Sequence, residues 1–506
     1  MRKARLYTDK HFKISSVDKR IFGSFLEHMG RAVYEGVYQP GNKNSDENGI
    51  RLDTTELVKE LGCTLVRYPG GNIVSAYNWE DGVGPKELRP VRLEAAWQNI
   101  EDNSFGTNEF MDWIKIANVS PMMAVNLGTR GVEAASNLLE YCNFESGTYY
   151  SDMRIKHGYR KPHNIKLWCL GNEMDGPWQI CHRNAHEYGT LAAQTAKVMK
   201  DIDPSIELAA CGSAGLCLPT FGEWDATVAD RCFRYIDYLS VHTYYNNNNN
   251  KTLDDTRSFL GNALAFDRQL HSVIAACDYV SGKNKSLKKI NLSVDEWNVV
   301  YRPHGKVPED ARWTKAPHQI EDVYNLEDAL LVGTMLLTMI NRADRVKIGC
   351  LAQLVNVIAP IMTSDNTAWK QTIFYPFANC SKYAKGIALS HITDCEKYDC
   401  KNFTDVPYIA SSVVYNEEEE KVVVFAVNRD LDDDCELTCD FRQFEGYSLE
   451  KHIVLNHDDI KAVNTEDAPN TVVETVKNQH SKLENGVLIS ILERHSWNVI
   501  VLSKGV

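Results

Sequence analysis

The stretch Ile165–Glu173 reads IKLWCLGNE, a run that is apolar except for Lys166 and ends directly in glycine and two polar residues. A short run that is apolar throughout, rather than alternating, is typical of a parallel β-strand whose two faces are covered by helices. Similar runs recur on both sides of it. They are Ile21–Glu27, Cys63–Tyr68, Met122–Leu127, Ile206–Cys211, Tyr238–His242, Ile290–Val294 and Val346–Gln353.

The segments between these runs include helical patterns. Asp53–Gly62 opens on a residue type that caps helices and closes on glycine. Asn325–Asn341 is apolar almost all round, which predicts a well-buried helix. A series of eight strand–helix units is the count of a closed (β/α)8 barrel. A doubly wound open sheet is the structural alternative, but no glycine fingerprint for a dinucleotide follows the first run. We therefore expect fold class α/β, with a (β/α)8 TIM barrel over residues 19–385.

The texture of the sequence changes after residue 385. Short β-type runs such as Val413–Tyr415, Lys421–Val427 and Trp497–Ser503 follow one another without a helical pattern between them. This favours an additional antiparallel β-sandwich domain over residues 386–506. Residues 1–18 contain the alternating segment Ala4–Ile14, which has no role in a barrel, so we expect them to add a strand to that sandwich.

Composition narrows the class of protein. The 506 residues carry a formal net charge of −13, which argues against nucleic acid and anionic membranes as partners. No apolar run follows the basic N-terminus, so a signal peptide is not expected. The 14 cysteines include no C-x-x-C pair and no cluster at zinc spacing, so we expect no metal. A reducing cytoplasm fits this usage best.

Polar side chains stand at the end of nearly every predicted barrel strand, where barrel enzymes place their active sites. A rim rich in amides and charged groups suits a ligand rich in hydroxyls. These side chains are Glu27, Arg67, Asn72, Asn126, Asn172, Glu173, His242, Tyr244, Glu296, Gln353 and Asn356.

Glu173 and Glu296 follow the fourth and seventh strands, and together they suggest glycoside cleavage. That reaction needs one carboxyl that holds a proton and one that is ionised. Mutual repulsion raises one pKa, and Arg67 is placed to keep the other carboxylate charged. Taken singly, an Asn-Glu pair most often starts a helix and Asp-Glu-Trp-Asn most often forms a turn.

For four other residues the sequence leaves both a functional and a structural role open. Glu27 is either a ligand of the substrate or part of a structural salt bridge, and His242 is either functional or a buried structural histidine. Trp97 and Trp178 are either sugar platforms or ordinary packing residues.

Six motifs lie at the ends of the predicted strands or between them. They are FLEH at 25–28, RYPGGN at 67–72, YNWEDG at 77–82, GNEMDGPWQI at 171–180, HTY at 242–244 and DEWN at 295–298. With these motifs the chain resembles the intracellular α-L-arabinofuranosidases of glycoside hydrolase family 51, over essentially the whole barrel. The string GNEMDGPWQI is specific to this group.

The resemblance implies a retaining, exo-acting enzyme that removes terminal non-reducing α-L-arabinofuranosyl residues from arabinan, arabinoxylan and arabino-oligosaccharides. By motif, Glu173 is the acid/base and Glu296 is the nucleophile. The resemblance also implies that the furanose is contacted by Glu27, Asn72, Asn172, Tyr244 and Gln353, and that Arg67 and His242 support the carboxylates. The family uses no cofactor, and its bacterial members are commonly hexamers, so we expect a homo-oligomer.

Two features depart from the family pattern. Relatives often carry Trp where this chain has Val300, beside the sugar site, and the run Asn246–Asn250 predicts a solvated, flexible loop near the rim. Two alternative functions stay open at this point. One is another retaining barrel glycosidase, a β-xylosidase or an endo-glucanase, and the other is an inert carbohydrate-binding barrel.

Overall fold

The computed structural model describes residues 1–247, 254–301, 307 and 309–505. Eight parallel strands close into a barrel, which confirms the predicted fold class and excludes the open doubly wound sheet. In their order around the barrel they are β10 (Asn291–Val299), β11 (Val346–Ala352), β2 (Gly23–Phe25), β3 (Leu65–Tyr68), β6 (Ser120–Val125), β7 (Leu167–Leu170), β8 (Glu207–Ala210) and β9 (Tyr238–Tyr245). Each lies within or overlaps one of the apolar runs of the sequence.

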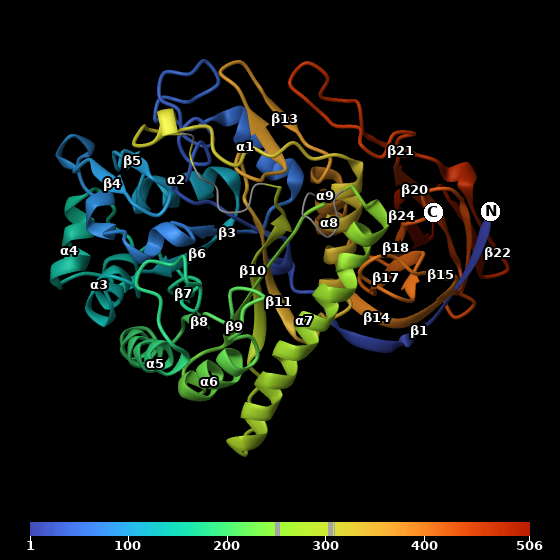
Figure 1. Cartoon of the computed structure of the whole chain (residues 1–506), viewed down its shortest axis with the longest axis horizontal. Helices are drawn as coiled ribbons and strands as arrows, with labels where there is room; N and C mark the ends of the chain where they lie inside the picture. Colours follow the sequence, from blue (N-terminus) through green and yellow to red (C-terminus); the bar gives the residue numbers. More distant parts are fainter. Residues whose placement is uncertain (248–253, 302–306, 308, 506) are drawn as a thin grey trace.

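Helices surround the barrel (Figure 1). They are α1 (Leu52–Leu61), α2 (Thr107–Ala117), α3 (Val132–Asn143), α4 (Tyr149–Lys156), α5 (Ala185–Ile202), α6 (Glu223–Cys232), α7 (Thr256–Lys283), α8 (Leu326–Ile340) and α9 (Phe374–Tyr383). The predicted buried helix is α8, and the Asn325 side chain caps its N-terminus by accepting a hydrogen bond from the backbone N–H of Asp328. Helix α1 ends at Gly62 as predicted, but Asp53 lies inside its first turn and Arg51 occupies the cap position.

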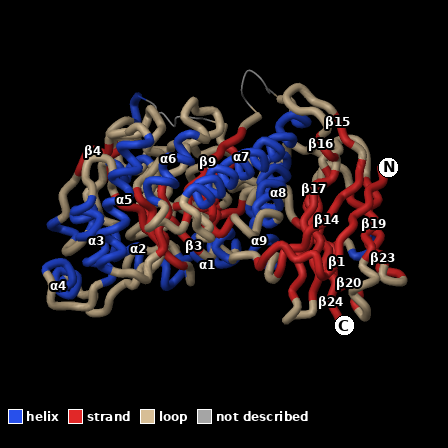
Figure 2. The backbone as a smooth tube through the Cα atoms, turned by 90° about the horizontal axis from the view of Figure 1, so that it is seen from below, coloured by secondary structure: helices blue, strands red, loops and turns tan. Residues whose placement is uncertain are grey.

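A ten-stranded sheet lies beside the barrel (Figure 2). Its order is β21 (Glu474–Val476), β20 (Tyr447–Leu455), β24 (Ser496–Lys504), β18 (Lys421–Asn428), β17 (Ile409–Asn416), β14 (Ile387–Cys395), β1 (Arg2–Ser16), β19 (Cys435–Asp440), β23 (Val487–Leu492) and β22 (Ser481–Glu484). All neighbours are antiparallel except β1 and β19. The sheet curls so that strands from near its two ends meet, and Ser481 of β22 hydrogen-bonds His452 of β20 at 2.9 Å.

The two ends of the chain therefore share one sheet, and both termini lie on its side of the molecule (Figure 1). The division of the chain at residues 18 and 385 stays a prediction. Three two-stranded sheets account for the other strands of the described residues. They pair β4 (Arg92–Glu94) with β5 (Asn99–Glu101), β12 (Ile361–Thr363) with β13 (Ala368–Lys370), and β15 (Lys397–Tyr398) with β16 (Val406–Pro407).

Helix α8 joins the barrel to the sheet, since it packs against β10 on one side and against β17, β18 and β24 on the other. The fit is close at Gly333, where a Cβ would lie 2.7 Å from the ring of Trp497. The asparagine run lies near this junction. Residues 248–250 are outside the described part of the chain, but Asn247 is 5% exposed and donates to Glu327, so the expectation of a solvated loop is wrong there.

Among the described residues, no helix combines the length and apolar character that crossing a bilayer requires. All 14 cysteines lie in the described part of the chain and are free thiols.

Candidate active site

A cavity of about 540 Å³ opens at the carboxyl ends of the barrel strands. Several residues predicted from the sequence line it, namely Glu27, Asn72, Glu173, Tyr244, Glu296 and Gln353. Arg67, Asn172 and His242 lie beneath these, with exposed fractions of 1%, 1% and 3%. Two residues that the sequence placed at the strand ends, Asn126 and Asn356, do not line the cavity. Asn126 bonds the backbone of Tyr77 and Gly128, and Asn356 bonds Arg31 and Thr363, so both hold loops.

Glu296 is held from two sides within β10. Its Oε1 accepts a hydrogen bond from Arg67 Nη1 at 2.7 Å, and its Oε2 accepts one from the Tyr244 hydroxyl at 2.9 Å. The second Arg67 nitrogen donates to Asn172 Oδ1, also at 2.7 Å. Gly71 passes so close that a Cβ there would lie 2.9 Å from Glu296 Oε1, so only glycine lets this loop reach the carboxylate.

Glu173 lies beyond the end of β7, where its backbone adopts a positive φ of 43° after Gly171. His242 Nδ1 lies 2.9 Å from Glu173 Oε1, and the Trp178 indole N–H donates to Oε2 at 2.6 Å. Burial raises the pKa of Glu173, because the charged carboxylate loses its hydration, and the charge of Glu296 raises it further while His242 and Trp178 oppose the shift. The site therefore favours the protonated form of Glu173.

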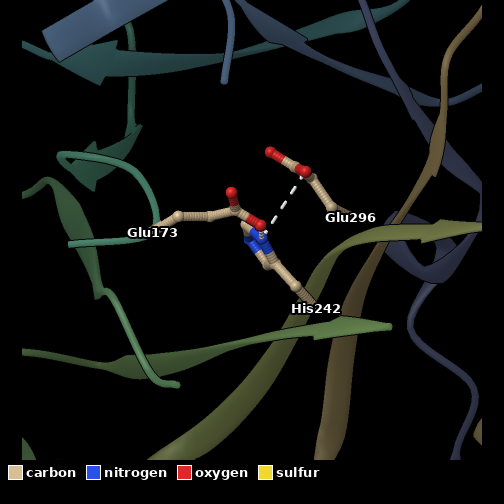
Figure 3. Close-up of side chains that lie close together, drawn as sticks. All are labelled: Glu173, His242 and Glu296. Atoms are coloured by element: carbon tan, nitrogen blue, oxygen red, sulfur yellow. Dashed lines mark hydrogen bonds and ion pairs between the residues drawn. The ribbon is translucent and has the colours of Figure 1, made fainter. Parts of the chain in front are cut away.

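The two glutamates and His242 converge on one point (Figure 3). One oxygen of each carboxylate and one nitrogen of His242 all lie within 4.8 Å of one another. Such a close approach of one oxygen from each carboxylate favours the short spacing of retaining glycosidases, roughly 5 to 5.5 Å, over the about 6.5 to 9.5 Å with which inverting enzymes admit a water.

These three side chains are also of types that bind metal ions. A metal ligand, however, must be a neutral imidazole. Burial opposes the charge on His242, yet Glu296, Asp295 and Glu173 outweigh it and raise the His242 pKa to about 10. This favours the imidazolium form of His242, so a metal ion could bind the ring only by displacing a proton from it.

Asp295 is a functional candidate that the sequence analysis did not single out. Its Oδ1 lies 3.2 Å from His242 Nε2 and accepts from Ser240 Oγ at 2.5 Å. Burial works against the charge of Asp295, but His242 and Arg67 lower its pKa overall. The buried site then pairs two cations, Arg67 and His242, with two anions, Asp295 and Glu296. The sequence did offer one sign of the role of Asp295, namely its position directly before Glu296.

Glu27 follows β2 and reaches the other wall of the cavity. Its Oε1 accepts from the Trp97 indole N–H at 2.8 Å and from the Ile73 backbone N–H at 3.0 Å. Burial raises the pKa of Glu27 to about 8. No ion pair joins Glu27 to any residue that the structure describes, which favours the ligand interpretation over the structural salt bridge.

Trp97 and Trp178 both line the cavity, and each indole donates to one of its carboxyls. The sequence left sugar stacking and ordinary packing open, but it gave no sign of these hydrogen bonds. Apolar side chains close the remaining wall. They are Leu216, Tyr245, Val300, Ile320 and Ile358.

The sequence of this chain matches two models of a known protein family. The family described as α-L-arabinofuranosidase 1 domain matches residues 57–264, and the α-L-arabinofuranosidase C-terminal domain matches residues 295–496.

Individual relatives agree. The chain is 54% identical to the intracellular exo-α-(1→5)-L-arabinofuranosidase 1 of Bacillus subtilis, over 100% of both chains. It is 43% identical to the exo-α-(1→6)-L-arabinofuranosidase of Bifidobacterium longum, over 99% of this chain and 97% of the relative. A solved family 51 α-L-arabinofuranosidase from Bifidobacterium longum superposes with a TM-score of 0.94 at 39% identity, over 99% of each chain.

Proposed function

This chain belongs to the α-L-arabinofuranosidases of glycoside hydrolase family 51, and from that premise we propose that it removes terminal non-reducing α-L-arabinofuranosyl residues by double displacement. The observation that carries the proposal is the approach of the Glu173 and Glu296 carboxyls to within 4.8 Å in one cavity. Arabinan, arabinoxylan and arabino-oligosaccharides are its proposed substrates.

In the first step, Glu296 attacks the anomeric carbon while Glu173 gives its proton to the leaving oxygen. Burial prepares Glu173 for this, because it raises the pKa of that carboxyl. As the proton leaves, the new carboxylate keeps its contacts with His242 and Trp178, which stabilise the charge. Arg67 and Tyr244 keep Glu296 in place for attack.

In the second step, Glu173 takes a proton from water, and the water oxygen attacks the glycosyl-enzyme from the face that the leaving group vacated. Two inversions give net retention at the anomeric carbon. Glu27, Asn72, Asn172 and Gln353 surround the place where the furanose hydroxyls would lie, and we assign them to substrate binding.

A panel of aryl glycosides tests the reaction class. We expect turnover of the α-L-arabinofuranoside, with NMR showing the α-anomer of arabinose as the first product. Preferential turnover of a β-xyloside or β-glucoside would support the other retaining glycosidases, and no turnover at all would support an inert binding barrel.

The linkage is tested with α-1,5- and α-1,6-linked arabino-oligosaccharides, since relatives named for each linkage match this chain. The greater identity to the (1→5) enzyme favours the first. Exo action predicts arabinose as the product from the first minutes, whereas oligosaccharides released early from linear arabinan would contradict it.

We further propose a cytoplasmic location, supported by relatives named intracellular and by the free thiols of all 14 cysteines. A homo-oligomer, with a hexamer expected from the family resemblance, is part of the same proposal. Light scattering on the purified protein tests it.

A further inference from the structure

Glu327 is an almost fully buried carboxylate, 1% exposed, in the first turn of α8. It lies where the barrel meets the C-terminal sheet, outside the cavity of the active site. A buried carboxylate is costly unless it is paired and hydrogen-bonded. Its partners therefore show what it holds together.

The partner of opposite charge comes from the C-terminal part of the chain, between β20 and β21. Lys461 Nζ lies 2.6 Å from Glu327 Oε1, and it is the one basic side chain in ion-pair contact with Glu327 among the residues described. The backbone on either side docks as well. Ile460 C=O accepts a hydrogen bond from the Glu327 N–H at 3.2 Å, and Val463 bridges to Asn325.

The remaining partners of Glu327 come from the loop after β9 and from the first residue of α7. Asn247 Nδ2 lies 3.2 and 3.4 Å from the two carboxylate oxygens, and Thr256 Oγ1 donates to Oε2 at 2.6 Å. Lys461 also reaches Asp254 at 3.0 Å, and the Asp254 N–H donates to Asn247 C=O at 3.1 Å. Lys461 and Glu327 thus fix both sides of the base of this loop.

That base lies close in sequence to the catalytic machinery. Asn247 is the third residue after Tyr244, whose hydroxyl donates to Glu296, and Tyr245 lines the cavity. The adjacent carboxylate, Asp328, accepts a hydrogen bond from the Tyr301 hydroxyl. Tyr301 directly follows Val300, which lines the cavity and whose N–H donates to Tyr245 C=O at 2.9 Å. The first turn of α8 therefore holds the ends of both β9 and β10.

We propose that Lys461 is a positioning residue for the reaction, which acts from the connection between β20 and β21 through Glu327 on the end of β9 that carries Tyr244. When the ammonium group of Lys461 is removed, Glu327 becomes a buried anion without a counter-charge. Its hydrogen bonds to Asn247 then change. Tyr244 then loses its fixed distance to Glu296. The inference rests on the proposed role of Tyr244, and it makes the C-terminal sheet part of the active-site scaffold.

The test compares Lys461→Met with Lys477→Met in the full-length protein. Lys477 is the control, because it too lies 2.6 Å from a carboxylate oxygen, but its partner Glu493 is only partly buried and both residues belong to the C-terminal sheet region. Rates on an aryl α-L-arabinofuranoside are taken well below the melting temperature of each variant and expressed per folded molecule. We expect kcat/KM to fall at least about tenfold for Lys461→Met and to stay within about twofold for Lys477→Met. Lys461→Arg, which keeps the charge, should restore most of the loss.

A double-mutant cycle shows whether the effect passes through Tyr244. In a Tyr244→Phe background, Lys461→Met should cost clearly less than in the wild type, because both changes disturb the same hydrogen bond. Full additivity would overturn the inference, as would wild-type kcat/KM in Lys461→Met.

Should Lys461→Met not fold, the pair Lys461→Met with Glu327→Gln leaves no buried anion but still lacks the ion pairs of Lys461 with Glu327 and Asp254, so kcat/KM should still fall. Wild-type kcat/KM in that pair would also overturn the inference, and a loss rescued only by restoring both residues would support it. Failure of the proposed function is distinguishable, because wild-type protein would then not turn over the arabinofuranoside at all.

Discussion

Trp178→Phe is expected to move the basic limb of the pH profile, because Trp178 donates a 2.6 Å hydrogen bond to Glu173. That bond stabilises the ionised carboxylate and so lowers the Glu173 pKa, against the burial that raises it. Phenylalanine keeps most of the ring but has no N–H, so the pKa of Glu173 should rise. Glu173 must be protonated for the first step. Activity is therefore lost as pH rises through that pKa, and the basic limb of kcat/KM should move to higher pH.

The size of the shift follows from the geometry. A hydrogen bond to a charged group contributes roughly 1.5 to 3 kcal/mol, and one pKa unit corresponds to about 1.4 kcal/mol. Trp178 is 44% exposed, so water replaces part of the lost bond and the lower end applies. We expect a shift of about one pH unit.

The assay is kcat/KM against pH on a natural arabino-oligosaccharide, whose poor leaving group needs the proton. Trp313→Phe is the matched control, since Trp313 has a similar exposure of 41% and does not line the cavity. On a dinitrophenyl arabinofuranoside, which needs little protonation, the limb should be weak in both proteins. A basic limb that stays in place, or moves to lower pH, in a folded Trp178→Phe variant would refute the assignment of Glu173 as the acid.

Three further predictions concern the carboxylates and their surroundings. With azide present, Glu173→Ala should convert an activated aryl arabinofuranoside to an azide of retained configuration and Glu296→Ala to the inverted azide. Anomers exchanged between the two variants would reverse the assigned roles, and the same anomer by NMR from both would refute them. Arg67→Met should lower kcat/KM by roughly 10- to 150-fold, because Glu296 loses a charge-assisted bond of 2.7 Å, and wild-type kcat/KM in the folded variant would show that this bond has no part in the reaction. Gly71→Ala should lower kcat by roughly 5- to 150-fold, the equivalent of about 1 to 3 kcal/mol of overpacking against Glu296, whereas Gly282→Ala, whose Cβ meets open space, should leave kcat unchanged.

The barrel could be predicted because its strands carry their own signal. Parallel strands covered by helices must be apolar on both faces, so IKLWCL at 165–170 is recognisable without any partner. Active residues of a barrel follow such strands, which is why Glu27, Arg67, Glu173 and Glu296 could be chosen from the sequence. The hydrophobic pattern was sufficient to predict the strands, and the position after each strand was sufficient to choose the candidate residues.

Contacts between distant segments were not predictable in this way. Sequence left Trp178 as packing or platform, because nothing local shows that its indole reaches Glu173. Asn247 sits in a polar run that predicts solvent, yet Glu327 and Lys461, far along the chain, bury it. His242 was ambiguous until its ring was seen between Glu173 and Asp295.

The chain by itself thus determined the barrel and the candidate carboxyls, because hydrophobic periodicity and strand ends are local properties of the sequence. Only the tertiary structure decided which side chains hold those carboxyls, how their pKa values shift, and that β1 lies between β14 and β19. The physical reason is that burial and charge pairing depend on residues that closure of the barrel and docking of the sheet bring together. These residues are far apart in the sequence, so no local pattern predicts which of them will meet.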